Sequence, residues 1–170
     1  MFKQAIRIFG LSVLSTASLA LLSKPVLATV YVSERANSNP NAEFRHRIQC
    51  SGGSFVTGMV VDEQGGYGVI DIKFLCSNGT ETTWATQNQN TENRYIKYGK
   101  LRSLRAYEQH NYGLIDFKYW SEGGDQGIFT ENARWDDYGT LDCSNNHVIG
   151  AEIYEQNGYG VVDIALVCQS

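Results

Sequence analysis

Long hydrophobic runs are scarce in this sequence, and only the N-terminal stretch approaches the roughly 18 residues that a membrane-spanning helix needs. Residues 1–28 combine a basic start (Lys3, Arg7) with an apolar middle and a small-residue end at Ala28. This order is typical of a secretory signal peptide, with cleavage expected after Ala28. We therefore expect an exported protein, secreted or periplasmic, with a single domain over residues 29–170.

An excess of basic charge is also missing. The chain has 14 Lys plus Arg and 18 Asp plus Glu, and three of the basic residues (Lys3, Arg7 and Lys24) lie in the expected signal peptide. The remainder has 11 basic against 18 acidic residues, a net charge near −7. A nucleic-acid partner would require a basic face, so we expect none.

Known catalytic signatures are absent as well. The sequence contains no P-loop, no HExxH metal motif and no nucleophile elbow. Its three histidines (His46, His110 and His147) neither recur in the repeats nor show metal-ligand spacing. A pair of carboxylates could in principle hydrolyse a glycosidic bond, but no further feature supports catalysis. We predict that the protein is not an enzyme.

Helical periodicity is missing too. β-Branched and aromatic residues alternate with polar ones through most of residues 29–170, which is typical of half-buried strands. The first such run, Val30 to Val32, is short. The fold class predicted is all-β.

A ten-residue phrase occurs three times, at residues 63–72, 108–117 and 155–164. Each copy reads Glu-Gln, two turn-forming residues, Tyr-Gly, two aliphatic residues, Asp and an apolar residue. The copies are 45 and 47 residues apart, and such a fixed period indicates one structural unit used three times. Three units can form a closed body with approximate threefold symmetry. The repeats expected are residues 49–86, 95–126 and 135–170.

The two turn-forming residues of each copy predict a β-hairpin. They are Gly65-Gly66, His110-Asn111 and Asn157-Gly158, and glycine and asparagine favour two-residue hairpin turns. Such a turn would place Glu63 opposite Gly68 and Val61 opposite Ile70, with equivalent pairs in the other copies. All apolar pairs would then share one face of the sheet.

This register places the repeated glutamates (Glu63, Glu108 and Glu155) on the core-facing side at the turn end. Two interpretations remain open. The three carboxylates could gather near the threefold axis and hold a cation, for which calcium is the candidate. Alternatively, each could accept backbone N–H groups of a nearby loop, as a buried charge requires.

The same register places the repeated aspartates on the outward face, together with the repeated tyrosines. Aromatic rings and carboxylates on a sheet surface can recognise sugars by stacking and by accepting hydroxyl protons. The candidate ligand-binding residues are therefore Tyr67, Asp71, Tyr112, Asp116, Tyr159 and Asp163. Their expected cross-strand neighbours differ, and Glu152 beside Asp163 would form a like-charge pair that could hold a cation. Purely structural roles remain the alternative.

Trp120 completes the candidate ligand-binding set. It shares the outward-facing parity of its strand with Asp116 and Lys118. If exposed, it would mark a binding surface, and if covered by a neighbouring segment, it would belong to the core.

Four cysteines form two pairs, each of which brackets a copy of the repeated phrase. Cys50 and Cys76 are 26 residues apart, and Cys143 and Cys168 are 25 apart. Three pairings are available, and the repeat symmetry favours Cys50–Cys76 and Cys143–Cys168. A zinc site is disfavoured because no CxxC spacing occurs.

The third repeat resembles the repeat of the vitelline membrane outer layer protein I family. The similarity rests on Trp135 to Gly139, Cys143, Gly150 and the close from Ile164 to Cys168. It implies a β-prism of three Greek-key sheets with disulfides inside the repeats, an extracellular coat protein, and affinity for amino-sugar oligosaccharides. The second repeat departs from the family by having Ser103 and Ser121 near the cysteine positions. Cys143 to Asn146 bears a weaker likeness to dermatopontin repeats.

Together these observations favour a secreted, non-enzymatic β-prism that binds a glycan or a cell-envelope polysaccharide and needs no cofactor, calcium aside. A structural coat or matrix protein is the second reading, and a polysaccharide hydrolase or transferase is the third.

Overall fold

The protein is an assembly of three antiparallel β-sheets, seen in a computed structural model that describes residues 28–65, 68–88, 90–110, 112–130, 132, 134–157 and 159–170. The all-β prediction is confirmed. Residues 1–27 of the expected signal peptide lie outside the described residues, and the described residues include no helix that could cross a membrane.

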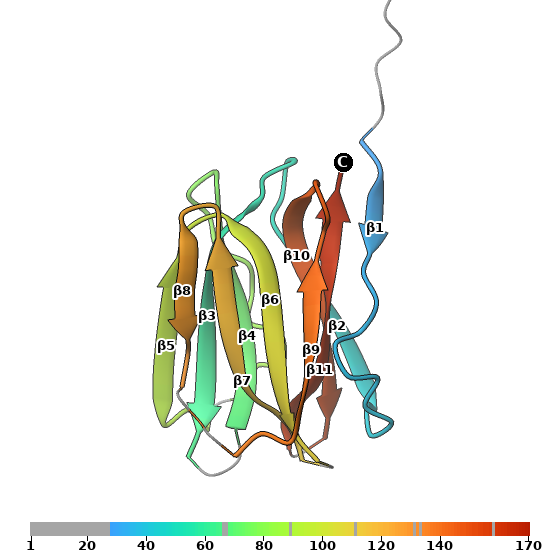
Figure 1. The fold of residues 1–170 in the computed structure, drawn as a ribbon, viewed down its shortest axis with the longest axis vertical. Coiled ribbons are helices and arrows are strands. Elements are labelled where there is room, and N and C mark those ends of the chain that lie inside the picture. Colours follow the sequence, from blue (N-terminus) through green and yellow to red (C-terminus); the bar gives the residue numbers. More distant parts are fainter. Residues whose placement is uncertain are drawn as a thin grey trace, which may run out of the picture.

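Each sheet is built around one hairpin made by a copy of the repeated phrase (Figure 1). Sheet A has the order β1 (Val30–Val32), β11 (Gly160–Gln169), β10 (His147–Gln156) and β2 (Phe44–Gln49). Sheet B has the order β4 (Gly68–Cys76), β3 (Val56–Gln64) and β5 (Asn93–Tyr98). Sheet C has the order β8 (Gly124–Ile128), β7 (Gly113–Ser121), β6 (Leu101–Gln109) and β9 (Asp137–Asp142).

The apolar faces of the three hairpins meet in one core. A side chain that faces this core is removed from water on all sides, so large aliphatic and aromatic residues dominate it. Fully buried members come from every sheet: Met59 and Phe74, Leu104 and Phe117, and Ile153 and Leu166.

The three hairpins exist as predicted, but their register differs from the prediction. Val61 pairs with Ile72 rather than Ile70, and Glu63 pairs with Val69 rather than Gly68. The turn has three residues instead of two, and a β-bulge at Ile70 adds one residue to β4. Because the net shift of Val61 is two residues, its apolar partner remains on the core side. The other two hairpins show the same shift.

The glycine that follows each hairpin turn lies against the next sheet. Gly68, Gly113 and Gly160 have φ angles of 90°, 105° and 98°, which favour glycine. A Cβ atom would lie 2.7 Å from the Leu114 carbonyl oxygen at Gly68 and 2.9 Å from that of Val161 at Gly113. At Gly160 it would lie 2.9 Å from the Val69 carbonyl oxygen. The contacts run in a closed cycle of three, so this glycine lets the sheets approach each other at the hairpin ends.

A second repeated element crosses the outer face of each hairpin near its turn. We call these segments the A strap (residues 36–41), the B strap (residues 85–88 and 90) and the C strap (residues 129–130, 132 and 134). Each one connects an edge segment on one side of the hairpin to the edge strand on the other side. The backbone N–H groups of Ala36, Ala85 and Phe129 donate to equivalent carbonyl groups of the hairpins. This crossover gives each sheet its Greek-key path.

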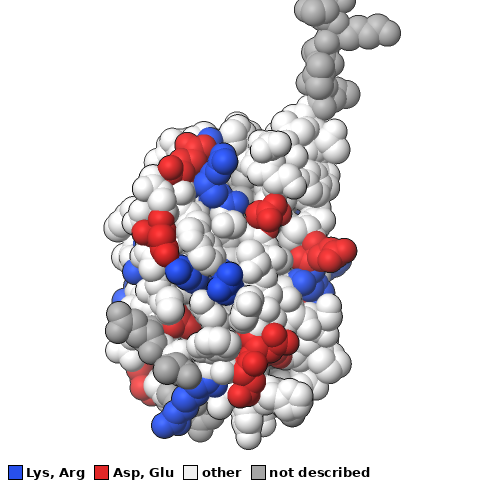
Figure 2. Space-filling model, in the orientation of Figure 1, with Lys and Arg blue, Asp and Glu red and all other residues white. Residues whose placement is uncertain are grey.

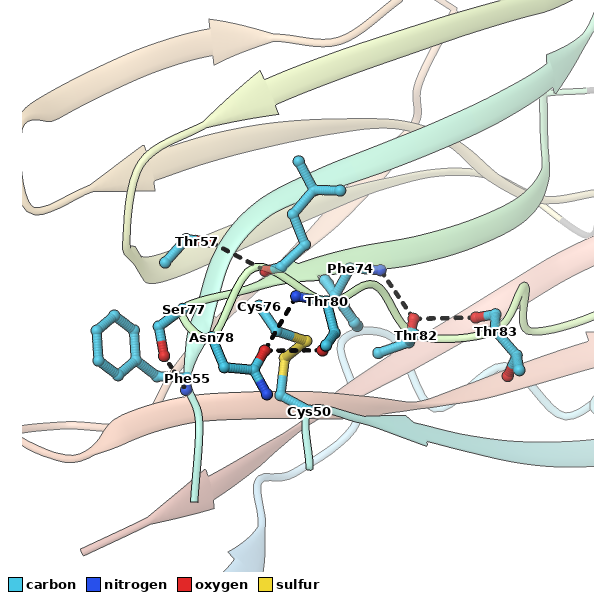
Figure 3. Close-up of a disulfide and its surroundings, with 11 residues drawn as sticks. Cys50, Phe55, Thr57, Phe74, Cys76, Ser77, Asn78, Thr80, Thr82 and Thr83 are labelled. Atoms are coloured by element: carbon cyan, nitrogen blue, oxygen red, sulfur yellow. Dashed lines mark hydrogen bonds between the residues drawn. A yellow bond between two sulfur atoms is a disulfide. The ribbon is translucent and has the colours of Figure 1, made fainter. Parts of the chain in front are cut away.

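Both disulfides favoured by the repeat symmetry are present, Cys50–Cys76 and Cys143–Cys168. Each joins two sheets, because Cys50 follows β2 of sheet A and Cys76 ends β4 of sheet B. Figure 3 shows the first disulfide beside the turn in which Asn78 accepts hydrogen bonds from Thr80.

The third junction, between sheets B and C, has a contact between Gly99 and Ser121 in the equivalent place. Tyr119 Oη donates to the Gly99 carbonyl there, at 2.6 Å. Ser121 thus lies at the position equivalent to Cys76, and Gly99, not Ser103, lies at the position equivalent to Cys50.

Candidate functional site

The repeated aspartates are not on the surface, contrary to the prediction. Asp71, Asp116 and Asp163 are 1%, 0% and 0% exposed. They do lie on the outer side of their strands, but the straps cover them. Asp116 accepts backbone N–H groups from Phe117, Phe129, Thr130 and Asn132.

Asp163 and Asp71 bind their straps in the same way. Asp163 accepts the backbone N–H groups of Ile164, Asn37 and Asn39 and the Arg35 Nε. Asp71 accepts those of Ile72 and Thr86. A buried carboxylate must be satisfied by such donors, and these aspartates hold the straps on the sheets.

Two of the three repeated tyrosines lie in described hairpin turns. Tyr112 and Tyr159 are 63% and 51% exposed, and Tyr67 lies outside the described residues. Trp120 is half-buried on the outer face of sheet C, where Arg105 and Lys118 approach its ring.

The repeated glutamates have different partners in the three copies. Tyr95 Oη donates to Glu63 at 3.3 Å, Asn39 Nδ2 to Glu108 at 2.5 Å, and His46 Nε2 lies 2.7 Å from Glu155. Burial raises the pKa of Glu63 and of Glu108. In the described part of the chain, no three His, Cys, Asp or Glu side chains are grouped to hold a metal ion.

The expected pairing of Glu152 with Asp163 is also wrong. Glu152 pairs across the strands with Ala165, and Asp163 pairs with Tyr154. The Glu152 carboxylate lies within ion-pair distance of Arg45 and Arg47, and it accepts a hydrogen bond from Tyr154. The two carboxylates therefore serve separate networks.

A hollow of about 400 Å³ opens on the outer face of sheet B, between β3, β5 and the B strap. Residues that the repeats do not share contribute most of its lining. These residues are Asp62, Asp71, Trp84, Gln87, Asn88, Thr91 and Arg94.

An ion pair fixes one wall of this hollow. Arg94 Nε and Nη2 donate to the two carboxylate oxygens of Asp62 at 2.6 and 2.8 Å, and Thr91 Oγ1 donates to Asp62 at 2.9 Å. Asp62 raises the pKa of Arg94 through this hydrogen bonding. A bidentate pair holds both side chains in one geometry, so the wall presents preorganised donors and acceptors.

Trp84 forms the aromatic part of the hollow. It immediately precedes the B strap, and its ring lies 4.8 Å from the Arg94 guanidinium and 5.0 Å from Lys73 Nζ. At the base of the hollow, burial raises the pKa of Asp71 against the lowering effect of its backbone hydrogen bonds. The hollow thus combines a half-buried indole ring, a fixed ion pair and two amide side chains.

The sequence offered weak signals for this site. Trp84 could be recognised as an aromatic that varies between copies, but nothing in the pattern connected it with Asp62 and Arg94. The connection depends on β5 pairing with β3, which places Arg94 directly opposite Asp62.

No protein-family model matches this sequence, and no curated protein sequence matches it either. Solved structures do match the fold. The agglutinin of Calystegia sepium superposes with a TM-score of 0.60 at 12% sequence identity, covering 84% of this chain and 97% of that one.

Two further solved structures show the same architecture. A Malaysian banana lectin matches with a TM-score of 0.60 at 9% identity, over 82% of this chain and 98% of the lectin. Frutalin from Artocarpus incisa matches with a TM-score of 0.59 at 6% identity, over 82% and 95%. At such low identity the similarity establishes the fold alone, and this fold is the jacalin-like β-prism.

Proposed function

We propose that the protein is a secreted, non-catalytic glycan-binding module, and that the hollow on sheet B holds a sugar. The observation that carries the proposal is the convergence of Trp84 with the fixed pair of Asp62 and Arg94 in one open hollow. The two disulfides agree with an extracellular polysaccharide or glycoconjugate as partner.

The chemistry of the hollow suits a neutral sugar. An indole ring offers an apolar surface for the C–H groups of a pyranose, while its edge remains wet. Asp62 accepts hydroxyl protons and Arg94 donates to hydroxyl oxygens, and neither side chain has to be ordered on binding. Gln87 and Asn88 each add an amide with two donors and one acceptor. Because Arg94 is neutralised by Asp62, the hollow has no unpaired cation to attract an anionic ligand.

The structural neighbours are compatible with this proposal. One solved structure similar to this chain is the Calsepa lectin in complex with a biantennary N-glycan, which matches with a TM-score of 0.61. Another is artocarpin complexed with methyl-α-mannose, with a TM-score of 0.55. These ligands belong to those proteins, and they indicate the class of molecule to test here first.

A glycan array tests the proposal with the secreted chain and two variants. We expect the wild-type protein to bind neutral glycans and Trp84→Ala to lose at least tenfold in affinity, as the loss of a stacking ring would cause. The matched control is Tyr98→Ala, because Tyr98 is also an exposed aromatic of sheet B (62%) but does not line the hollow.

Two outcomes of the glycan array would contradict the proposal. A wild-type protein that binds no glycan, or a Trp84→Ala protein that binds as well as wild type, would overturn the assignment of the hollow. The exposed turn residues Tyr112 and Tyr159, with Trp120, remain our alternative ligand contacts, and loss of binding in Tyr112→Ala alone would move the site to the hairpin turns.

A further inference from the structure

The outer face of sheet C carries two cations directly opposite each other. Arg105 of β6 pairs across the strands with Lys118 of β7. Like charges in this position destabilise a sheet. The described registers hold two other like-charge pairs, but both are pairs of carboxylates (Asp62 opposite Asp71 and Glu108 opposite Asp137), and Arg94 and Asn39 donate to Asp62 and Glu108. The pairing of Arg105 with Lys118 should therefore destabilise sheet C, and we ask what other role these two cations serve.

The scaffold does not require a cation at this place. Val60 of sheet B and Glu152 of sheet A occupy the equivalent register positions of the other two hairpins. All three hairpins fold with the same topology. A cation at this register position is therefore found on sheet C and not on the other two sheets.

The two cations are neutralised unequally. Lys118 Nζ lies 2.7 Å from the Asp125 carboxylate, whose pKa it lowers by hydrogen bonding. No carboxylate of the described residues lies within ion-pair distance of Arg105, whose Nε donates to Thr140 Oγ1 at 3.3 Å. The guanidinium thus keeps its charge and most of its donors for another molecule.

Aromatic rings hold Arg105 in place. Its guanidinium carbon lies 4.4 Å from the centroid of the Tyr138 ring and 5.4 Å from that of Trp120. Stacking on rings orients the planar guanidinium without using its N–H groups. The charge is thus preorganised for an anion.

An exposed aromatic platform continues from this cation toward the turn end. Tyr138 and Trp135 are 46% and 43% exposed, and their ring centroids are 5.9 Å apart. The buried Tyr107 ring supports both from beneath, at 5.2 Å from Trp135. Exposed rings beside a cation offer a sugar a stacking surface and offer its acidic group a partner.

We propose that the outer face of sheet C is a second binding site, specific for an acidic polysaccharide built from uronate residues. The pyranose rings would lie on Tyr138 and Trp135. The carboxylate would take the N–H fork of Arg105, with Lys118 as the second cation. This site lies on a different sheet from the hollow and does not depend on the hollow being a sugar site.

The attraction between this face and an acidic polysaccharide would come from a few nearby cations and not from the charge of the whole protein. The whole chain has a formal net charge of −4, so it does not attract polyanions in general. In Figure 2, which looks onto the side of the molecule where β6, β7, β8 and β9 lie, blue and red groups are interspersed, with blue side chains near the middle of the face. Binding should therefore be weakened by salt and depend on few residues.

The test compares polygalacturonate with its fully methyl-esterified form, which has the same backbone without charge. We expect the wild-type protein to bind the acid at least tenfold more tightly than the ester in calorimetric titrations. Arg105→Gln should lose at least tenfold in affinity for the acid, because it removes a charge-assisted bidentate contact. Arg105→Lys keeps the charge but not the fork and should lose about threefold.

Two controls separate this site from other causes. Arg102→Gln removes an equal charge from the same strand, at an arginine that faces Glu122, and should bind the acid within about twofold of wild type. Trp84→Ala should bind the acid like wild type. Equal binding of acid and ester, or equal losses in Arg105→Gln and Arg102→Gln, would overturn the proposal and leave the sheet B hollow untouched.

Discussion

Sheets B and C place different residues at the same positions of one scaffold. Next to the buried aspartate of each hairpin, sheet B has Asp62 where sheet C has Tyr107. On the neighbouring edge strands, sheet B has Arg94 where sheet C has Tyr138. The cation of sheet B is consequently neutralised by a carboxylate, and Arg105 of sheet C remains on ring faces.

Under the two proposals, the scaffold and the binding sites use separate residues. The repeated residues hold the body together: glycines let the sheets approach at the hairpin ends, and aspartates tie down the straps. The residues that line the two proposed sites face outward, and most of them vary between copies. Damage to the first group should therefore affect both faces, whereas changes in the second group should affect one face only.

The largest effect should come from the glycine cycle. Gly113→Ala should lower the free energy of unfolding by about 4 kcal/mol, because the residue has a positive φ and the new Cβ meets the backbone of β11. Urea denaturation measures the loss.

Gly124→Ala is its matched control. Gly124 has a similar φ of 111° and no atom within 4 Å of an added Cβ, so strain alone should cost about 1–2 kcal/mol. Equal losses in the two variants would mean that inter-sheet contact contributes nothing.

The next largest effect should come from the disulfide that joins sheets A and B. Replacing Cys50 and Cys76 together by serine opens a loop of 26 residues and should cost about 3.5 kcal/mol in the chain-entropy model. Hydrogen exchange should quicken at the A–B junction and less at the B–C junction, where Gly99 meets Ser121 without a disulfide. Uniform quickening across both junctions would contradict local tethering.

Much of the fold could be predicted from the sequence because its signals are local. The turn residues of the phrase predicted three hairpins, and the spacing of Cys50 from Cys76 and of Cys143 from Cys168 predicted the disulfides. The register was missed because a three-residue turn with a bulge at Ile70 leaves no compositional trace beyond the glycine at position 68. The exposure of Asp71, Asp116 and Asp163 was predicted wrongly for another reason, because the straps that cover them were not foreseen.

The candidate sites were harder to predict, because they depend on contacts between distant segments. The straps share an asparagine at positions 39, 88 and 132, and this spacing was the available clue that something covers each aspartate. Trp84 and Arg94 come together only after β5 has paired with β3. The sequence-based predictions concentrated on residues that the three repeats share, and these proved to be scaffold residues. Both proposed sites consist mainly of residues that differ between the repeats.

A single substitution should make sheet B resemble sheet C. Asp62→Asn releases Arg94 from its ion pair but leaves it beside Trp84, as Arg105 lies beside Tyr138. We expect a new affinity for polygalacturonate and a weaker affinity for neutral glycans. Stability should fall by only about 1 kcal/mol, because the Arg94 side chain is 51% exposed.

The control for this exchange is the double variant Asp62→Asn with Arg94→Gln. It should lose the new affinity for polygalacturonate and retain the original acid binding of sheet C, as measured by the same titrations. If Asp62→Asn acquires no acid binding, the neutralising carboxylate is not what distinguishes the two faces.

The smallest effect should be a pH dependence that the buried aspartates of both sheets share. Burial raises the pKa of Asp71 and of Asp116 above the ordinary value of 3.8. Between its unfolded and its native pKa, each group binds more protons in the folded state, so the free energy of unfolding should decrease as the pH rises through this window. Urea denaturation at a series of pH values from about 4 to 7 should show this slope.

Asp116→Asn should reduce the slope without abolishing it, because Asp71, Glu63 and Glu108 still titrate with raised pKa values. It should also cost more stability at neutral pH than Asp71→Asn, since among the described residues the backbone N–H groups of Phe117, Phe129, Thr130 and Asn132 donate to Asp116, a larger set than donates to Asp71. An unchanged slope would mean that Asp116 is not a source of the pH dependence.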